Sequence, residues 1–315
     1  MTARHDTRER GAALAVLLRD AIDYAGLFPP AQLDMPGAVA EYAAYLRSAD
    51  AWALGRFVVP VARLDELAAE AGGRPPDPGE PLGAPPAGRG LSAVFATDVR
   101  ADVDRLIAFN AAHEADADRW WGRVEAVELR AASVDAIRDA ARAVPSHLER
   151  FVEIPLTGDT ASLVRAIRDA GAAAKVRTGG ITADAFPSSA DLARFLATCV
   201  AEGVRFKATA GLHHPVRGDY ALTYEPASAK GRMYGFLNVF LAAALLRSGR
   251  DESVARAMLE EDDPSSFTFD ADGVSWRGHR VPAADLRAVR STGIQSFGSC
   301  SFREPIDDLT ALGLL

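Results

Sequence analysis

Short β-branched runs alternate with amphipathic segments along most of the chain. The runs occupy residues 56–61, 91–97, 124–130, 150–156, 172–180 and 204–212. Their starts lie 22 to 35 residues apart, and the segments between them carry apolar residues at helical spacing. This is the period of successive βα units, and the nearly continuous apolar runs are typical of parallel strands covered on both faces.

Two α/β architectures fit this pattern, a doubly wound open sheet and a (β/α)8 barrel. No GxGxxG or GxxxxGK[ST] loop follows any run, so the glycine-rich loop of a nucleotide-binding open sheet is missing. The runs also end in polar residues, among them Arg130, Glu153 and Lys175. Strand ends and the loops after them converge on one mouth in a barrel. We predict a (β/α)8 TIM-like barrel with the six runs as parallel neighbours in chain order.

The two remaining strands carry weaker signals. The segment 266–281 reads as a hairpin around Asp272–Gly273 and supplies a candidate seventh strand. The segment 294–302 supplies an eighth. Residues 1–50 predict an N-terminal helical extension, because Leu14, Leu17 and Leu18 recur at helical spacing. We therefore expect a single barrel domain over residues 1–315.

Two stretches interrupt the βα rhythm. Residues 72–90 are dominated by Pro and Gly and predict a long surface loop. Residues 214–232 follow the sixth run and form a candidate lid, since loops after barrel strands often close over substrate. The most apolar stretch, 233–246, is too short to span a bilayer and predicts a buried core helix.

Composition narrows the class of protein further. The 315 residues carry a net charge of −8, which argues against nucleic acid or an anionic membrane as partner. Cys199 and Cys300 are too few for a disulfide scaffold or a multi-cysteine metal site. No targeting segment is evident. We expect a cytoplasmic protein with a small-molecule substrate and no bound cofactor; formation of a homo-oligomer is left open.

Lysine is scarce in this chain. Only Lys175, Lys207 and Lys230 occur against 32 arginines. Arginine cannot become a neutral nucleophile or form an imine, so a retained lysine marks a candidate position for amine chemistry.

Lys175 and Lys207 lie on consecutive predicted strands, whose neighbours are about 4.8 Å apart. Two ammonium groups in one cavity repel each other, so we expect the pKa of at least one to fall. A neutral amine can attack a carbonyl group and form a Schiff base. The alternative is a pair of ordinary lysines that bind an anion.

The two lysine strands, AAAKVRTGG and VRFKATAGL, resemble those of deoxyribose-phosphate aldolase and related class I aldolases. The resemblance covers about forty residues. It implies that Lys175 forms the imine and that Lys207 lowers its pKa. It also implies that Ala210–Gly211 correspond to the glycine pair that approaches the substrate phosphate. Glu128 or Glu153 would replace the family's helper aspartate.

Further polar residues cluster at the predicted strand ends. Glu128, Glu153 and the pair His213–His214 fit acid–base catalysis, a divalent metal site, or simple ion pairing of the carboxylates with Arg130 and Arg177. Adjacent residues on a strand face opposite ways, so we expect at most one histidine to be catalytic.

Two features suggest an anionic substrate. Arg177 follows Lys175 on the same run and is a candidate anion clamp. Small residues at 296–301, with Ser299 among them, are a candidate anion nest, although a tight turn explains them equally well.

The sequence leaves three functions open. The first is a carbon–carbon lyase in which Lys175 is the nucleophile, Lys207 tunes its pKa, and Glu153 or His213 moves protons. In this function Arg177, Glu128, Gly211, His214 and Ser299 contact the substrate. The second is a metal-assisted lyase or isomerase that uses Glu128, Glu153 and a histidine. The third is a non-catalytic barrel that binds a small molecule.

Overall fold

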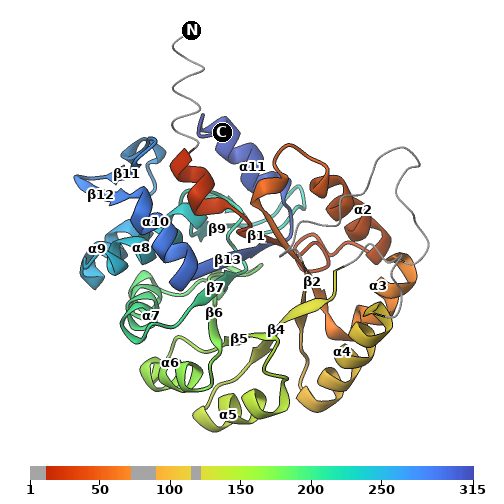
Figure 1. The fold of residues 1–315 in the computed structure, drawn as a ribbon. Coiled ribbons are helices and arrows are strands. Elements are labelled where there is room, and N and C mark those ends of the chain that lie inside the picture. Colours follow the sequence, from red (N-terminus) through yellow and green to blue (C-terminus); the bar gives the residue numbers. More distant parts are fainter. Residues whose placement is uncertain (1–11, 72–89, 115–121) are drawn as a thin grey trace.

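The computed structural model describes residues 12–71, 90–114 and 122–315. Eight parallel strands close into a barrel in the order β1-β13-β7-β6-β5-β4-β3-β2 (Figure 1). Their bounds are β1 (Ile22–Tyr24), β2 (Leu54–Pro60), β3 (Leu91–Val94), β4 (Val124–Arg130), β5 (Glu149–Glu153), β6 (Ala173–Arg177), β7 (Phe206–Thr209) and β13 (Ile294–Ser299). The predicted barrel is confirmed, as is the order of its six clearest strands.

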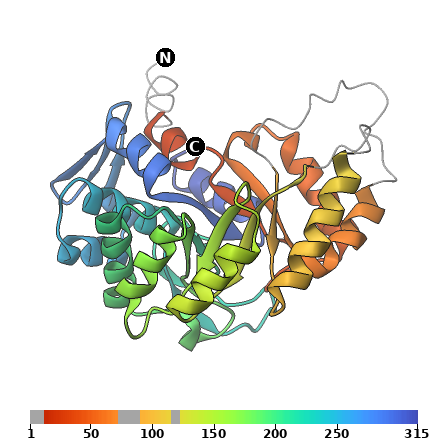
Figure 2. The same cartoon turned by 60° about the horizontal axis from the view of Figure 1, so that its bottom comes forward.

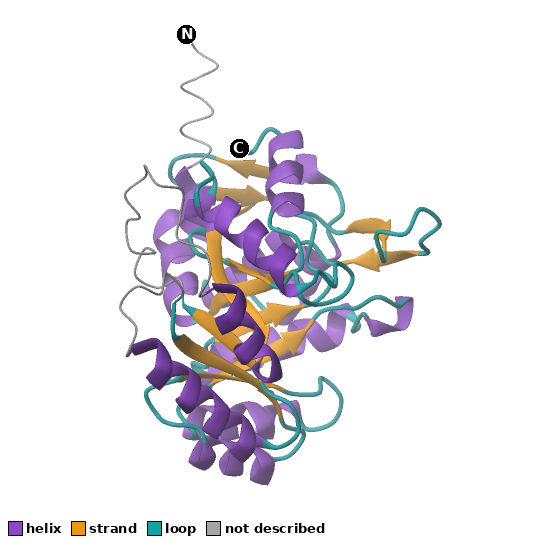
Figure 3. Ribbon diagram, turned by 90° about the vertical axis from the view of Figure 1, so that its right-hand side faces the viewer, coloured by secondary structure: helices purple, strands orange, loops and turns teal. Residues whose placement is uncertain are grey.

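Helices surround the strands on the outside (Figures 1 and 3). Their bounds are α2 (Met35–Leu46), α3 (Leu64–Ala71), α4 (Val99–Glu114), α5 (Val134–Ala143), α6 (Thr160–Asp169), α7 (Ser189–Glu202), α8 (Phe236–Arg247), α9 (Glu252–Glu260), α10 (Ala283–Thr292) and α11 (Arg303–Ala311). Residues 12–18 are also helical. Local signals begin several helices: Ser133, Asp159 and Ser188 accept backbone N–H bonds as N-caps of α5, α6 and α7.

Two predicted strand positions need correction. The first fifty residues are more than a helical extension, because Ile22–Tyr24 forms barrel strand β1 between β13 and β2. The segment 266–281 supplies no barrel strand. Its alternating residues instead form an antiparallel sheet of β10 (Phe267–Phe269), β11 (Gly273–Trp276) and β12 (His279–Pro282). This sheet lies outside the barrel (light blue in Figures 1 and 2).

The extra sheet helps to cover α8, which is apolar on all sides. Its residues from Phe236 to Leu246 are all buried, as expected for a helix that is hydrophobic all round. It packs against α9, α10 and β12 as well as β13. The amide of Asn238 donates to the carbonyls of Met258 and Glu261, both at 2.8 Å, and therefore joins α8 to the end of α9.

The candidate lid contains regular structure. Residues 214–232 were expected to be irregular, but they include β8 (Gly218–Ala221), which pairs antiparallel with β9 (Lys230–Met233). Alternating small and charged residues gave no clear strand signal here. The predicted surface loop at 72–90 lies almost wholly outside the described residues.

The interior of the barrel is mainly polar. The large apolar core lies between strands and helices, whereas Ala126, Phe151 and Ala173 form a small separate apolar cluster. Barrel interiors are usually filled by branched aliphatic side chains, so a charged interior layer needs an explanation. No helix in the described part of the chain is long and apolar enough to cross a bilayer.

Candidate functional site

A cavity of about 690 Å³ opens where the barrel strands end. Its lining includes the charged side chains Glu128, Arg130, Lys175, Arg177, Lys207 and Glu304, and the imidazoles of His213 and His214. Residues after β1, after β3, after β6 and in the β8–β9 turn also line the cavity. The structure thus places both predicted lysines at the cavity, on neighbouring strands where Lys175 is in register with Lys207.

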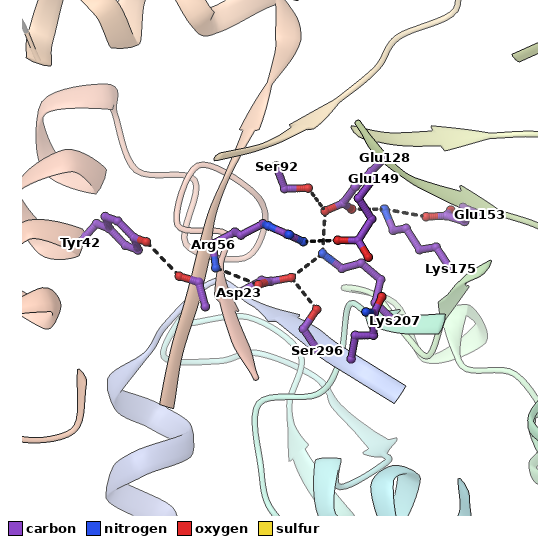
Figure 4. Close-up of polar contacts among 12 residues, drawn as sticks. Asp23, Tyr42, Arg56, Ser92, Glu128, Glu149, Glu153, Lys175, Lys207 and Ser296 are labelled. Carbon is purple, nitrogen blue, oxygen red and sulfur yellow. Dashed lines mark hydrogen bonds and ion pairs between the residues drawn. The ribbon is translucent and has the colours of Figure 1, made fainter. Parts of the chain in front are cut away.

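Five charged side chains inside the barrel form the lysine cluster: Asp23, Glu128, Glu153, Lys175 and Lys207 (Figure 4). Lys207 Nζ lies 2.6 Å from Asp23 Oδ2 and 2.7 Å from Glu128 Oε1. Lys175 Nζ lies 2.8 Å from Glu128 Oε2 and 3.0 Å from Glu153 Oε2. Carboxylates and ammonium groups therefore alternate across the barrel, and Glu128 is shared by both lysines.

Neighbouring strands hold the carboxylates in place. Ser92 donates to Glu128 Oε1 at 2.7 Å, and Ser296 donates to Asp23 Oδ2 at 2.7 Å. The backbone N–H of Arg56 donates to Asp23 Oδ1 at 2.9 Å. Buried carboxylates need such donors, because an unpaired buried charge is strongly destabilising.

The two lysines differ in access to the cavity. The Lys207 side chain is 1% exposed and the Lys175 side chain 8%. Lys207 Nζ also lies 5.2 Å from the centre of the Phe151 ring, which covers it with an aromatic face. Lys175 is therefore the more accessible amine.

Electrostatics fix the charge of the cluster. Burial alone would raise the pKa of Glu128, but the ammonium groups of Lys175 and Lys207 hold it well below its usual range. For Lys207, burial alone would lower the pKa, but Asp23 and Glu128 outweigh this and raise it. Lys207 is therefore not a lysine with a lowered pKa, because two carboxylates compensate its charge.

Glu153 joins the cluster to two arginines. Its Oε1 lies 3.2 Å from Arg130 Nε and 3.3 Å from Arg177 Nε. Burial alone would raise the pKa of Glu153, but the lysine and arginine charges lower it. The predicted ion pairing with Arg130 and Arg177 therefore holds for Glu153, whereas Glu128 pairs with the lysines.

A second group, the histidine cluster, lies at the cavity mouth and comprises His213, Tyr224, Cys300 and Glu304. His213 Nδ1 lies 3.2 Å from Glu304 Oε2 and 3.8 Å from Cys300 Sγ. Tyr224, on the β8–β9 turn, has its hydroxyl 3.1 Å from Glu304 Oε2 and 3.3 Å from Cys300 Sγ. Burial would lower the pKa of His213, but Cys300 and Glu304 raise it to about 10.

His213 and His214 both face Glu304, against the expectation from strand alternation. His214 Nε2 lies 3.8 Å from Glu304 Oε1, and its Nδ1 lies 2.6 Å from Asp308. The rule fails because β7 ends at Thr209, so the two histidines follow loop geometry. The His214 ring also stacks on Tyr220 at 3.5 Å between centroids.

Gly211 and Ser299 differ in their relation to the cavity. Gly211 lines it with φ +71°, and a Cβ there would lie 2.9 Å from Phe186 and 3.1 Å from Gly179 Cα. Only glycine fits this left-handed position without strain. Ser299 is not part of the lining, and its hydroxyl donates to the Ser301 carbonyl at 2.6 Å. The position of Ser299 therefore gives no support to its predicted contact with substrate.

Several site residues were missed at the sequence level. Asp23, Ser92, Tyr224 and Glu304 carry no motif, and their partners are far away in the chain. Ser296 belongs to the small-residue run at 296–301, but nothing in the sequence indicates that it binds Asp23. Asp23 had one weak signal, a charged residue directly after Ala21 and Ile22. Residues 24–30 follow Asp23 directly, and Phe28, Pro29 and Pro30 line the cavity.

The carboxylates of the site are not grouped as metal ligands. In the described residues, no set of three or more His, Cys, Asp or Glu side chains has an arrangement that could hold a metal ion. Glu128 and Glu153 instead contact Lys175. The ligand set of the metal-assisted alternative is therefore not assembled here.

Comparison with known sequences gives no family assignment. No protein-family model matches the chain, and no curated protein sequence matches it significantly. The barrel itself does not determine the reaction, because this fold supports many chemistries. The function must be argued from the side chains of the site.

Proposed function

We propose that the protein is a carbon–carbon lyase of the aldolase type, acting on a small carbonyl compound through a Schiff base on Lys175. One observation carries the proposal. The Lys175 amine meets the cavity between two carboxylates, one of which also binds a second, more deeply buried lysine.

The charges of the site suit an iminium intermediate. A lysine ammonium and a carbonyl compound give a protonated imine and water, with no net release of protons. Nζ carries one positive charge both before imine formation, as the ammonium, and after it, as the iminium ion. Glu128 and Glu153, at 2.8 and 3.0 Å, compensate it in the free enzyme and in the intermediate alike, so the environment needs little rearrangement.

Glu153 is the better proton carrier of the two carboxylates. Glu128 is bound by two buried ammonium groups and a hydroxyl. Glu153 contacts one lysine and two arginines whose side chains are 75% and 43% exposed, and solvent screens their charges. Glu153 Oε2 can therefore take a proton from Lys175 Nζ and return it.

Carbon–carbon cleavage then follows from the iminium ion. The bond between the α and β carbons breaks, and its electron pair moves towards the iminium nitrogen to give an enamine. The β-hydroxyl proton passes to Glu153, and the β carbon departs as a carbonyl. Protonation of the enamine and attack by water release the second product and restore Lys175.

Lys207 and His213 have supporting roles. The raised pKa of Lys207 keeps it as an ammonium, and it shares Glu128 with Lys175. Glu128 is therefore shared by both cations, and Lys175 is the one whose side chain is more accessible from the cavity. The raised pKa of His213 makes it an imidazolium at neutral pH, suited to donating a hydrogen bond to a substrate oxygen.

Borohydride reduction tests the proposal directly. The protein is incubated with a panel of small aldehydes and ketones, reduced, digested and mapped by mass spectrometry. The chain has only three lysines, and the exposed Lys230 on β9 reports non-specific reaction. We expect an adduct on Lys175 at concentrations where Lys230 is unmodified.

Two results would contradict the proposal. Equal labelling of Lys175 and Lys230 would show that the site adds nothing to amine reactivity. Saturable binding of a carbonyl compound without adduct or turnover would indicate a non-catalytic binding barrel.

A further inference from the structure

Two arginines lie directly above the lysine cluster. Arg130 comes two residues after Glu128 on β4, and Arg177 comes two residues after Lys175 on β6. Residues i and i+2 of a strand face the same side, so both arginines face the barrel interior. They lie one layer nearer the cavity mouth, about 7 Å along the strands.

Their guanidinium groups are only partly used by the protein. Each contacts Glu153 Oε1 through Nε, at 3.2 and 3.3 Å. Among the described residues, neither arginine has a protein partner for its terminal Nη groups. Both side chains line the cavity. Four N–H-bearing Nη groups thus remain for a ligand at its rim.

The charge balance favours an anion at this position. Arg130, Arg177, Lys175 and Lys207 face only three carboxylates, those of Asp23, Glu128 and Glu153. His213 is paired with Glu304 at the mouth. In this described part of the site, four cationic side chains and three carboxylates give a net charge of +1. The lysines are enclosed by carboxylates, so the uncompensated charge lies at the two arginines.

We propose that Arg130 and Arg177 bind the acidic group of the substrate while its carbonyl carbon reaches Lys175. This rests on the proposed function and deepens it by defining the substrate class. The substrate is a short-chain oxo compound with a carboxylate or phosphate a few atoms away from the carbonyl, because the arginines project from their strands one layer, about 7 Å of backbone, nearer the mouth than Lys175. An acid group attached directly to the carbonyl is too close to reach both.

Four methyl ketones test the inference by borohydride trapping at Lys175. They are 4-oxopentanoate, hydroxyacetone phosphate, the neutral 2-pentanone, and pyruvate with its acid on the carbonyl carbon. We expect half-maximal trapping by one of the first two at a concentration at least roughly tenfold lower than for 2-pentanone or pyruvate, as for a charged hydrogen bond. The better of the two identifies the acid group.

Arginine variants identify the residues responsible. Arg130→Gln with Arg177→Gln should remove the advantage of the spaced acids over 2-pentanone. The readout is the ratio of their half-maximal concentrations within the same variant, so that any change in Glu153, which both arginines contact, affects all four ketones alike. The matched control is Arg138→Gln, because Arg138 is an exposed arginine on α5 paired with Asp135 and is not part of the cavity lining. It should retain the full advantage.

The inference is overturned if 2-pentanone or pyruvate traps as well as the spaced acids, or if the advantage survives the double variant. If no ketone forms an adduct, ligand-observed NMR of 4-oxopentanoate and hydroxyacetone phosphate separates the two proposals. Arginine-dependent binding without an adduct refutes the Schiff base but supports the anion site. Absence of arginine-dependent binding refutes the anion site.

Discussion

The lysine cluster and the histidine cluster share one cavity but are built in different ways. Every member of the lysine cluster projects from a barrel strand, and the backbone around it is fixed by the closed sheet. His213, Tyr224 and Cys300 lie in loops or turns, and Glu304 lies in the first turn of α11. Sites on strands are held more rigidly than sites on loops. The lysine cluster is therefore suited to chemistry that needs fixed distances, and the histidine cluster at the cavity mouth is suited to contacts that adjust to the ligand.

The largest expected effect is on adduct formation, and it should differ between the two lysines of the lysine cluster. Lys175→Arg should abolish adduct formation and turnover, because a guanidinium cannot form the imine. Lys207→Arg should retain part of both, because the positive charge beside Asp23 and Glu128 survives. Trapping experiments on both variants measure this. A Lys175→Arg protein that still forms an adduct at the site would contradict the assignment.

Glu128→Gln should cause the next largest effect, on stability. The substitution leaves Lys175 and Lys207 without their shared carboxylate, and breaking a buried ion pair costs about 3–5 kcal/mol. Urea unfolding at pH 7 measures the loss. The surface pair Arg63–Glu66 provides the control, and Glu66→Gln should leave the unfolding free energy unchanged.

The same variant has a pH signature. The folded pKa of Glu128 lies below its unfolded value, so its contribution is complete above about pH 4.5 and is lost as the pH falls below that. The difference in unfolding free energy between the wild-type protein and Glu128→Gln should therefore shrink with acidification. A constant difference from pH 7 to pH 3 would contradict this.

The histidine cluster should show the opposite pH dependence. The pKa of His213 is raised from 6.5 to about 10, so its contribution is complete below about pH 6.5 and is lost as the pH rises towards 10. In the wild-type protein we expect a loss of about 1.5–3 kcal/mol at alkaline pH, the value of a charged hydrogen bond, and His213→Asn should not show it. Urea unfolding between pH 6 and pH 10 measures it. The exposed His147 is the control, since His147→Asn should keep the wild-type profile.

The smallest expected effect concerns the β8–β9 turn. Tyr224→Phe removes the hydroxyl contacts with Cys300 and Glu304 but keeps the ring. We expect a loss of only about 0.5 kcal/mol, typical of a single exposed hydrogen bond, with faster hydrogen exchange at the Leu222 amide that bonds Ala229. Unchanged exchange there would show that the tyrosine does not hold the turn.

Most strands and helices could be predicted because they depend on the local periodicity of apolar residues. Six strands, their parallel order and the buried helix α8 follow from patterns within about 35 residues of sequence. β1 escaped detection because three residues carry no readable period. The segment 266–281 was misplaced because an alternating hairpin pattern does not show which sheet it joins.

The candidate site, like the fold, could be predicted from the sequence only in part. Lys175, Lys207, Glu128 and Glu153 could be selected from the sequence because they lie near the ends of predicted strands, and barrel topology brings strand ends together. The contacts among them could not be predicted. Lys207 meets Asp23 across 184 positions of sequence, since closure of the barrel places β1 beside β13, and the Lys207 side chain reaches from β7, on the other side of β13. Only the tertiary structure decided which carboxylate compensates which lysine, because the electrostatic energy of a buried group depends on its neighbours in space.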